Sequence, residues 1–271
     1  MQINIKTDQE LDNSKIYDVS SKEGFMILSD LWLEAAHWQK WMWGQYYGVP
    51  IVQFPSDFYF LHRVVEKSNP SVIIETGTSY GGGSIFFAAQ LLVQNILGDR
   101  DLGTIITIDV YNPDNILNNP KEKDSRMQEA VRIKETRIKT AEVIEKLGIK
   151  YLPILGSSID SKILTKIRNL ISLEEEVLVI LDSSHVKEHV DKELLLYATL
   201  VNPGGYIIVC DTYCHRISDK FKEERLWDFK ADPLFSVKEF LSTHDNWEMD
   251  EEFTTYPISA IQYGVIRKKR T

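Results

Sequence analysis

Short apolar runs rich in isoleucine and valine alternate with longer segments of mixed polarity from about residue 71 onward. The short runs predict strands because they are bounded by turn-forming residues, and the longer segments have the spacing of helices. The five predicted strands are SVIIET (71–76), GTIITID (103–109), KYLPIL (150–155), EVLVILD (176–182) and GYIIVCD (205–211). Such alternation predicts a parallel sheet with helices on both faces.

The end of the chain has a different pattern. A helical segment at about 236–242 precedes two further apolar segments, NWEMDEEF (246–253) and AIQYGVIRKK (260–269). We interpret these segments as a closing pair of strands, which brings the predicted sheet to seven strands. The predicted fold class is therefore α/β, with a seven-stranded, mostly parallel sheet.

The first 69 residues predict a helical extension packed on a core domain of residues 70–271. Apolar residues at three- and four-residue spacing predict an amphipathic helix over 23–45, and a second helix is expected from about 56 to just before Pro70. The first helix carries Trp32, Trp38, Trp41 and Trp43. These tryptophans fit a core contact or the surface of a homo-oligomer better than the wall of a substrate pocket.

Composition and charge restrict the class of protein. The 271 residues, 43% of them apolar, suffice for one substantial core, and the net charge of −9 argues against nucleic acid as the main partner. Cys210 and Cys214 lie too close in sequence to clamp distant elements, which favours a reducing cytoplasm. Neither a signal peptide nor an apolar run approaching the roughly 18 residues of a membrane span is visible.

Ligands of open parallel sheets bind beyond the carboxyl ends of the strands. The five predicted strands end at Glu75, Asp109, Gly156, Asp182 and Asp211. Four of these five residues are acids, so the expected site is rich in carboxylates.

The first predicted strand runs into a glycine-rich turn, ETGTSYGGGS (75–84), which opens a nucleotide-binding unit. A dinucleotide fingerprint, G-x-G-x-x-G, is incomplete here, and Glu75 precedes Gly77 by two residues. An acid beside the turn suits a ligand with a positive centre rather than two phosphates. S-adenosylmethionine carries a sulfonium and an ammonium group, so we expect the turn, Thr78 included, to bind this cofactor.

Two further positions fit an adenosine ligand. Asp109 can accept hydrogen bonds from both ribose hydroxyls, which does not separate S-adenosylmethionine from NAD, or it can cap a turn. Ser157, in the segment GSSID (156–160), can bond the adenine edge, although Ser158 or Asp160 can equally cap the next helix.

The fourth and fifth strands deliver a catalytic set. Asp182 and Asp211 should be neighbours, and two adjacent carboxylates repel unless a cation or proton lies between them. This favours a Mg²⁺ site over the alternative, in which one acid caps a helix and the other is hydrogen-bonded in a loop. His185 follows Asp182 in the same turn and is our candidate general base. A zinc site built on His185 and His189 lacks a soft third ligand.

Five motifs, in this order between about residues 47 and 241, resemble the cephalosporin hydroxylase / rhamnosyl O-methyltransferase family. They are YGVPIVQFPSD, VIIETGTSYGGGS, LDSSHVKEHVDKEL, LVNPGGYIIVCDT and PLFSVKEFL. The resemblance implies a Rossmann-like class I methyltransferase that uses S-adenosylmethionine and Mg²⁺ and acts on a small-molecule or glycan hydroxyl.

The same resemblance implies functional residues at matching positions. Glu75, Gly77 and Gly81 would bind the cofactor, and Asp182 and Asp211 would bind the metal. Where relatives that bind metal have an acid just before the second aspartate, this chain has Cys210, so one hard oxygen ligand is missing.

Two other classes of function stay open at this stage. One is an NAD-dependent oxidoreductase, which the incomplete glycine fingerprint disfavours. The other is a member that binds the cofactor without catalysis. For the methyltransferase interpretation, the charged segment 215–229 is expected to act as a lid over the acceptor pocket.

Overall fold

The computed structural model describes residues 18, 20–41, 43–98, 102–119, 125–214, 233–254 and 259–270. Its strands are β1 (Trp43–Tyr46), β2 (Val49–Val52), β3 (Val72–Thr76), β4 (Thr104–Asp109), β5 (Lys150–Leu155), β6 (Val177–Leu181), β7 (Tyr206–Val209), β8 (Trp247–Met249) and β9 (Val265–Lys268). Its helices are α1 (Lys22–Trp38), α2 (Pro55–Ser68), α3 (Gly82–Gly98), α4 (Pro113–Leu117), α5 (Ser125–Lys146), α6 (Ser161–Arg168), α7 (Lys187–Tyr197), α9 (Pro233–Thr243) and α10 (Glu251–Thr254).

The described strands form a seven-stranded sheet in the order β5-β4-β3-β6-β7-β9-β8, and a separate hairpin of β1 and β2. Strands β3 to β7 are parallel, whereas β9 runs antiparallel to both β7 and β8, which confirms the predicted mostly parallel sheet. The chain leaves β3 for β4 and β5 on one side and returns to β6 on the other. The neighbours β3 and β6 therefore form the switch point where such sheets bind ligands.

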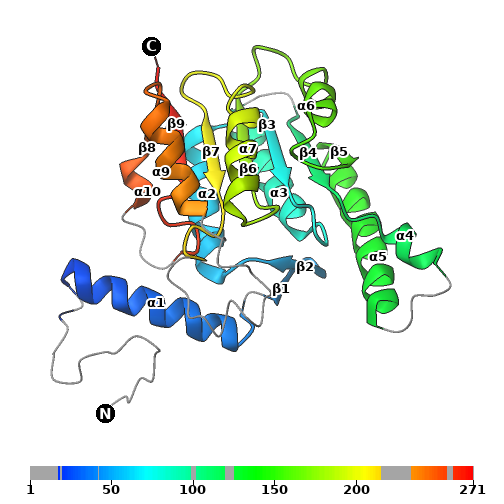
Figure 1. Ribbon diagram of the computed structural model, residues 1–271. Coiled ribbons are helices and arrows are strands. Elements are labelled where there is room, and N and C mark those ends of the chain that lie inside the picture. Colours follow the sequence, from blue (N-terminus) through cyan, green and yellow to red (C-terminus); the bar gives the residue numbers. More distant parts are fainter. Residues whose placement is uncertain are drawn as a thin grey trace.

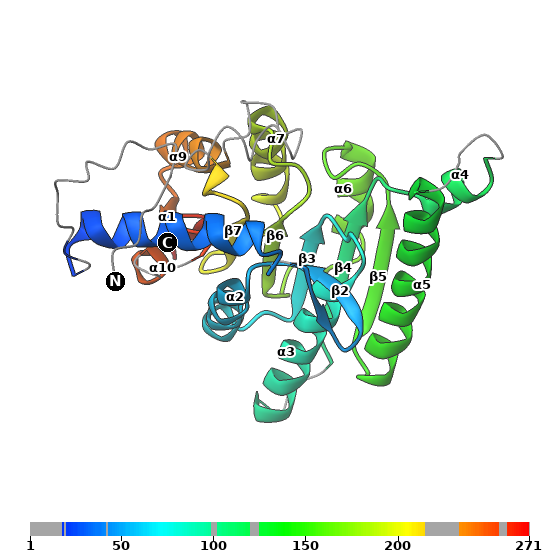
Figure 2. The same cartoon turned by 90° about the horizontal axis from the view of Figure 1, so that it is seen from below.

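Helices cover both faces of the sheet, as predicted. Helices α2, α3 and α5 lie on one face, and α6, α7 and α9 lie on the other (Figures 1 and 2). Along β3, Ile73 packs in the buried cluster of the first face, while Val72 and Ile74 pack in that of the second. Each such side chain contributes about 1.5–3 kcal/mol by leaving water, so the pleat of the strands itself divides the core into two layers.

The predicted closing strands are shorter in the structure. The first of them ends at Met249, because Asp250 accepts a hydrogen bond from the backbone N–H of Glu252 at 3.1 Å and starts the short helix α10. The second begins only at Val265, after a turn. The strand prediction over 246–253 is therefore wrong in its second half.

The predicted helix over 23–45 is also too long. Helix α1 ends at Trp38, where Lys40 adopts a left-handed backbone (φ 57°) and the N–H of Trp41 donates to the carbonyl of Ala36 at 2.9 Å. This hydrogen-bond pattern ends a helix and usually places glycine where Lys40 stands, so the sequence carried no stop signal. The tryptophans consequently lie on different elements, with Trp43 in β1.

The hairpin that follows was not predicted. Tyr47 and Gly48 form its turn, and both have positive φ (50° and 75°), as a two-residue hairpin turn requires. Figure 2 shows the hairpin in front of the sheet, on the side where α1 crosses. This position allows β2 to reach the carboxyl ends of the central strands.

Helix α1 packs on the segments that flank the sheet. Leu33 and Ala36 are buried in one cluster with Phe54, Tyr213 and Ala260. The division into an extension (1–69) and a core (70–271) stays a prediction, because α2, which belongs to the first part, shares a buried cluster with β3.

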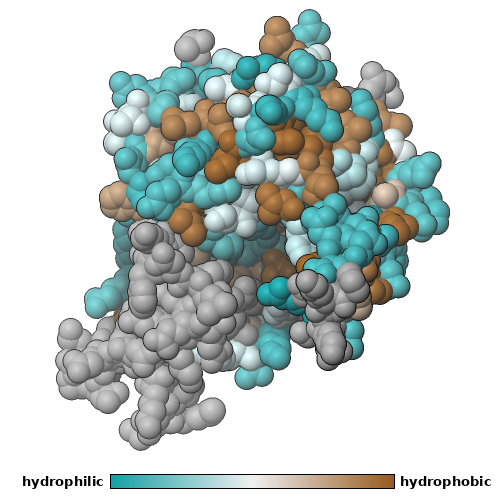
Figure 3. All heavy atoms as spheres, turned by 45° about the vertical axis from the view of Figure 1, so that its right-hand side comes forward, coloured by the Kyte–Doolittle hydropathy of each residue, from teal (hydrophilic) through white to brown (hydrophobic). Residues whose placement is uncertain are grey.

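The helices, the surface and the cysteines of the described residues bear on the membrane and redox expectations. None of the described helices is long and apolar enough to span a membrane. On the face shown in Figure 3, apolar residues lie interspersed with hydrophilic ones. Cys210 and Cys214 are both buried, as thiols that do not form a disulfide.

The close approach of β3 and β6 can be tested at Gly77. This residue has φ 88°, and a Cβ atom would lie 2.1 Å from the carbonyl oxygen of Asp182. We expect Gly77→Ala to lower the free energy of unfolding by more than about 1 kcal/mol. Gly44→Ala is the matched control, since its Cβ would meet nothing closer than 4.0 Å. Equal thermal unfolding midpoints for the two variants would contradict this geometry.

Candidate active site

A cavity of about 520 Å³ opens at the carboxyl ends of the central strands. All the strand ends singled out in the sequence line it: Glu75, Asp109, Gly156, Asp182 and Asp211. The parallel ladders place them there, because each strand is in register with its neighbour and all five point the same way. The prediction that these residues share one edge of the sheet is confirmed.

The glycine-rich turn forms one wall of this cavity. Gly77 and Gly81 both have positive φ, and a Cβ on Gly81 would lie 2.4 Å from Oγ1 of Thr140. Gly83 likewise has no room for a side chain, because Oε1 of Glu75 would lie 2.4 Å from its Cβ. Glycine at these positions thus lets the backbone pass close to both the sheet and α5.

Glu75 lies buried beneath the turn and still lines the cavity. Its Oε2 accepts a hydrogen bond from Oγ of Ser84 at 2.8 Å. Burial raises the pKa of Glu75 to about 8, and the negative charge of Asp109 adds to this rise. A positively charged ligand group beside Glu75 would favour its ionised form.

Asp109 is held by the chain itself. Its Oδ2 accepts from the N–H of Ser79 at 2.9 Å and from Nη2 of Arg137 at 2.8 Å, and its Oδ1 accepts from the N–H of Tyr111 at 2.7 Å. A carboxylate offers about four acceptor positions, so these three bonds leave about one. Contact with both ribose hydroxyls stays a prediction, and Asp109 alone has too few positions left for it.

The segment after β5 presents Ser158 to the cavity, while Ser157 is not among the lining residues. Asp160 caps α6, accepting from the N–H of Lys162 at 2.8 Å, which confirms the capping alternative for that residue. A bond from Ser157 to an adenine edge stays a prediction.

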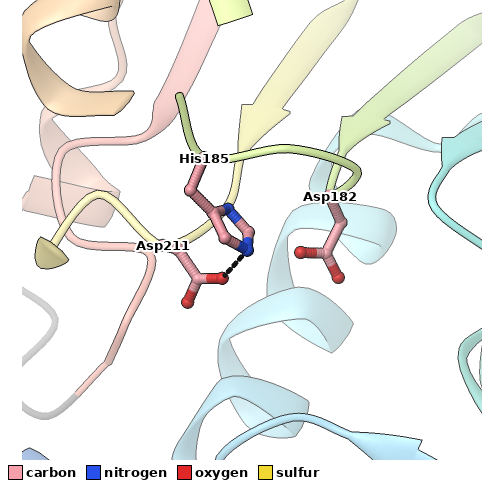
Figure 4. Close-up of side chains that lie close together, drawn as sticks. All are labelled: Asp182, His185 and Asp211. Atoms are coloured by element: carbon pink, nitrogen blue, oxygen red, sulfur yellow. Dashed lines mark ion pairs between the residues drawn. The ribbon is translucent and has the colours of Figure 1, made fainter. Parts of the chain in front are cut away.

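Asp182, His185 and Asp211 form a cluster that lines the same cavity, shown in Figure 4. Nε2 of His185 lies 2.9 Å from Oδ2 of Asp211, and one potential ligand atom from each residue lies within 4.8 Å of the others. Gln53, which follows β2, donates from Nε2 to Oδ2 of Asp182 at 2.8 Å. The unpredicted hairpin therefore supplies a residue that orients the first carboxylate.

The cluster carries an excess of negative charge. Burial raises the pKa of Asp182 well above its usual range, and the charge of Asp211 raises it further, while His185 lowers it. The pair of carboxylates thus favours a proton or a cation between them, as the sequence predicted.

The three side chains suit a divalent cation. Two carboxylate oxygens and one imidazole nitrogen are common ligands of such ions. Cys210 is buried, and both burial and the surrounding carboxylates raise the pKa of its thiol, so it stays a neutral, soft group. Among the described residues, a cation at this cluster would therefore rely on Asp182, His185 and Asp211.

His189 belongs to a different network. Its Nε2 lies 3.0 Å from Oγ of Ser158 and 3.2 Å from Oγ of Ser183, and Ser183 donates to the fully buried Glu193 at 2.7 Å. Among the described residues, the one group that could hold a metal contains His185 but not His189, so the zinc pair is not formed.

Gln53 and Arg137 are among the lining residues that were not found from the sequence. Gln53 reaches the site only because of the hairpin, and Arg137 stands in the middle of α5 among other charged residues. Neither has a spacing or neighbour in the sequence that signals a role. The predicted lid, residues 215–229, lies outside the described residues.

The cavity lies at the switch point of an open sheet that has an antiparallel strand, β9. Acids line it, and a full phosphate-binding fingerprint is absent from the glycine turn. This combination is that of the Rossmann-like methyltransferase fold class. The family described as Rhamnosyl O-methyltransferase/CmcI matches residues 38–269, and the chain belongs to this family. The resemblance drawn from the five motifs is thereby confirmed.

Among characterised relatives, the chain is 26% identical over 189 residues to the Rhamnosyl O-methyltransferases of Mycobacterium tuberculosis and Mycobacterium bovis. The match covers 66% of this chain and 63% of each relative, so the chain spans less than two thirds of their length.

Two solved structures are similar at lower identity. One, of CmcI with Mg and SAM, is 18% identical, with a TM-score of 0.49 over 84% of this chain and 77% of that chain. The other, the O-methyltransferase from Bacillus cereus in complex with SAH, is 16% identical, with a TM-score of 0.49 over 72% and 73%.

The buried state of Glu75 predicts a pH dependence of stability. In the folded chain its pKa is about 8, against 4.5 for an unperturbed glutamate. Between these values the folded state holds the extra proton, so the contribution of Glu75 to stability is full at low pH and is lost as pH rises through about 8. Glu75→Gln lacks this titration, so its free energy of unfolding relative to that of the wild type should rise by up to about 5 kcal/mol over that pH range.

Urea unfolding of both proteins at several pH values measures this gain. The control is Glu142→Gln on the exposed side of α5, for which the difference from the wild type should not change with pH. A pH-independent difference for Glu75→Gln would mean that the carboxylate is already ionised in the folded chain.

Proposed function

We propose that this chain is an S-adenosylmethionine-dependent O-methyltransferase that acts on a hydroxyl of a sugar or natural product. The observation that carries the proposal is the cavity itself, which is lined both by the glycine turn with Glu75 and by the cluster of Asp182, His185 and Asp211. Membership in the Rhamnosyl O-methyltransferase/CmcI family supports the reaction class. The rhamnosyl relatives support a glycan or sugar acceptor, since rhamnose offers only hydroxyl nucleophiles.

Methyl transfer needs an in-line approach of the hydroxyl oxygen to the methyl carbon. As the O–C bond forms and the S–C bond breaks, the sulfonium becomes a neutral thioether and the hydroxyl proton must leave. The chain supplies the orientation of both partners within one cavity, and it supplies a base at the cluster.

His185 is the proposed base. Asp211, 2.9 Å from its Nε2, holds the imidazole in place and stabilises the imidazolium that forms when the hydroxyl proton is taken up. Gln53 holds Asp182 at the edge of the same space. These contacts orient the acceptor side of the site before any substrate arrives.

A divalent cation such as Mg²⁺ would be held by Asp182, His185 and Asp211, and when bound it supplies positive charge that lowers the pKa of an acceptor hydroxyl. His185 would then serve as a ligand instead of a base. The two roles differ in their response to chelation, which makes them separable.

The cofactor is tested by calorimetric titration of the purified chain with S-adenosylmethionine, S-adenosylhomocysteine and NADH. We expect micromolar binding of both S-adenosyl ligands, none of NADH, and at least about tenfold weaker S-adenosyl binding in Glu75→Ala. Binding of NADH instead would support the oxidoreductase alternative and overturn the proposal. Cofactor binding without turnover on any sugar hydroxyl would identify a non-catalytic member of the family.

The cation is tested by titrating Mg²⁺ alone into the chain. Asp182→Asn and Asp211→Asn each remove a hard oxygen charge, so both should weaken Mg²⁺ binding more than about tenfold. Asp191→Asn is the control, because this half-buried carboxylate of α7 pairs with Lys187 and is not part of the cluster. No heat of Mg²⁺ binding, together with full methyl transfer in EDTA, would leave His185 as the base without a metal.

A further inference from the structure

The cofactor side of the cavity contains a cation that the sequence analysis did not assign. Arg137 projects from α5, lines the cavity, and forms an ion pair with Asp109 at 2.8 Å. Both side chains keep some contact with solvent, with 21% of Arg137 and 15% of Asp109 exposed. The pair therefore borders the space that a ligand would fill.

Arg137 is fixed at this place by the backbone. Its Nε donates to the carbonyl of Ser79 at 2.8 Å, and its Nη1 donates to the carbonyl of Tyr111 at 2.8 Å. The first carbonyl belongs to the glycine turn and the second to the loop after β4. The guanidinium thus joins the two loops between which an adenosine ligand would lie, and its orientation is set before binding.

The described hydrogen bonds leave unused donors on Arg137 and an unused acceptor position on Asp109. A guanidinium has five N–H donors, and three of those of Arg137 are used on Ser79, Tyr111 and Asp109. About two donors remain on Arg137, beside about one acceptor position on Asp109. A ligand group that fills both must donate one hydrogen bond and accept another at adjacent atoms.

We propose that Asp109 and Arg137 together bind the cis-diol of the cofactor's ribose. One hydroxyl donates to Asp109, and an oxygen of the diol accepts from Arg137. This assignment rests on the proposed function, because it takes the ligand to be an S-adenosyl compound. Asp109 has too few acceptor positions left for both ribose hydroxyls. In this assignment Asp109 accepts from one hydroxyl, and Arg137 donates to an oxygen of the diol.

The arrangement also gives Arg137 a role in specificity. A ligand without one of the ribose hydroxyls would leave a charged donor or acceptor of the pair without its partner, which costs more than the loss of a neutral hydrogen bond. The pair therefore distinguishes a ribose from a deoxyribose.

The test compares S-adenosylhomocysteine with its 2′-deoxy and 3′-deoxy analogues by calorimetry, in the wild type, in Arg137→Met and in Lys134→Met. Lys134 is the matched control, since it is a cation on the same helix that pairs with Asp114 away from the diol site. In the wild type, each deoxy analogue should bind about tenfold more weakly than S-adenosylhomocysteine.

In Arg137→Met, S-adenosylhomocysteine should lose about tenfold in affinity, while at least one deoxy analogue loses less than about twofold, because the contact is already absent. Lys134→Met should leave all three affinities unchanged. An equal loss for all three ligands in Arg137→Met would assign Arg137 to loop support alone and overturn the proposal.

Two further outcomes remain decisive. Wild-type binding of both deoxy analogues as tight as that of S-adenosylhomocysteine overturns the proposal without any variant, so a failure of Arg137→Met to fold does not block the test. Arg137→Lys keeps the positive charge but not the planar guanidinium. This variant should show an intermediate loss of affinity, which is again smaller for one deoxy analogue. A wild type that binds no S-adenosyl ligand rejects the proposed function itself, which is a distinct result.

Discussion

The parallel pairing of β3 with β6 is the contact on which the rest of the site depends. It places the glycine turn and the aspartate turn side by side, so closely that Gly77 has no room for a side chain against the carbonyl of Asp182. The pairing of β6 with β7 then sets Asp211 beside Asp182. Each acid reaches the cavity because of the strand that ends before it, and the chemistry of the site follows from the order of the strands.

The resulting cavity concentrates buried carboxyl groups. Burial raises the pKa of Glu75 and Asp182, and Asp57, bound to Ser259 behind the site, has its pKa raised to about 7 for the same reason. Such groups destabilise the protein when they ionise, and a cationic ligand offsets this cost. A sulfonium cofactor and a divalent cation are both cationic ligands, so the electrostatics of the site favour the two ligands of the proposed function.

Segments distant in the sequence complete the site. Gln53 comes from the hairpin before α2, and Arg137 comes from the middle of α5. Both hold a carboxylate that the strands deliver, and both leave the site with a defined orientation before a ligand binds. Preorganisation of this kind lowers the entropy lost on binding.

The sheet and the acids at its edge were predictable from the amino-acid pattern. Short continuous apolar runs define the strands, and every parallel strand presents its last residue at the same edge, so the positions of Glu75, Asp109, Asp182 and Asp211 followed from local pattern. The motifs also indicated the family correctly.

The side chains that contact these acids depend on how distant parts of the chain pack together. The end of α1 at Trp38 depends on a left-handed lysine, the hairpin turn on a left-handed tyrosine, and the contacts of Gln53, Arg137 and His189 on helices and loops far away in the chain. These contacts have no local signature, because a hydrogen bond between distant residues requires a geometry that forms only when the layers pack.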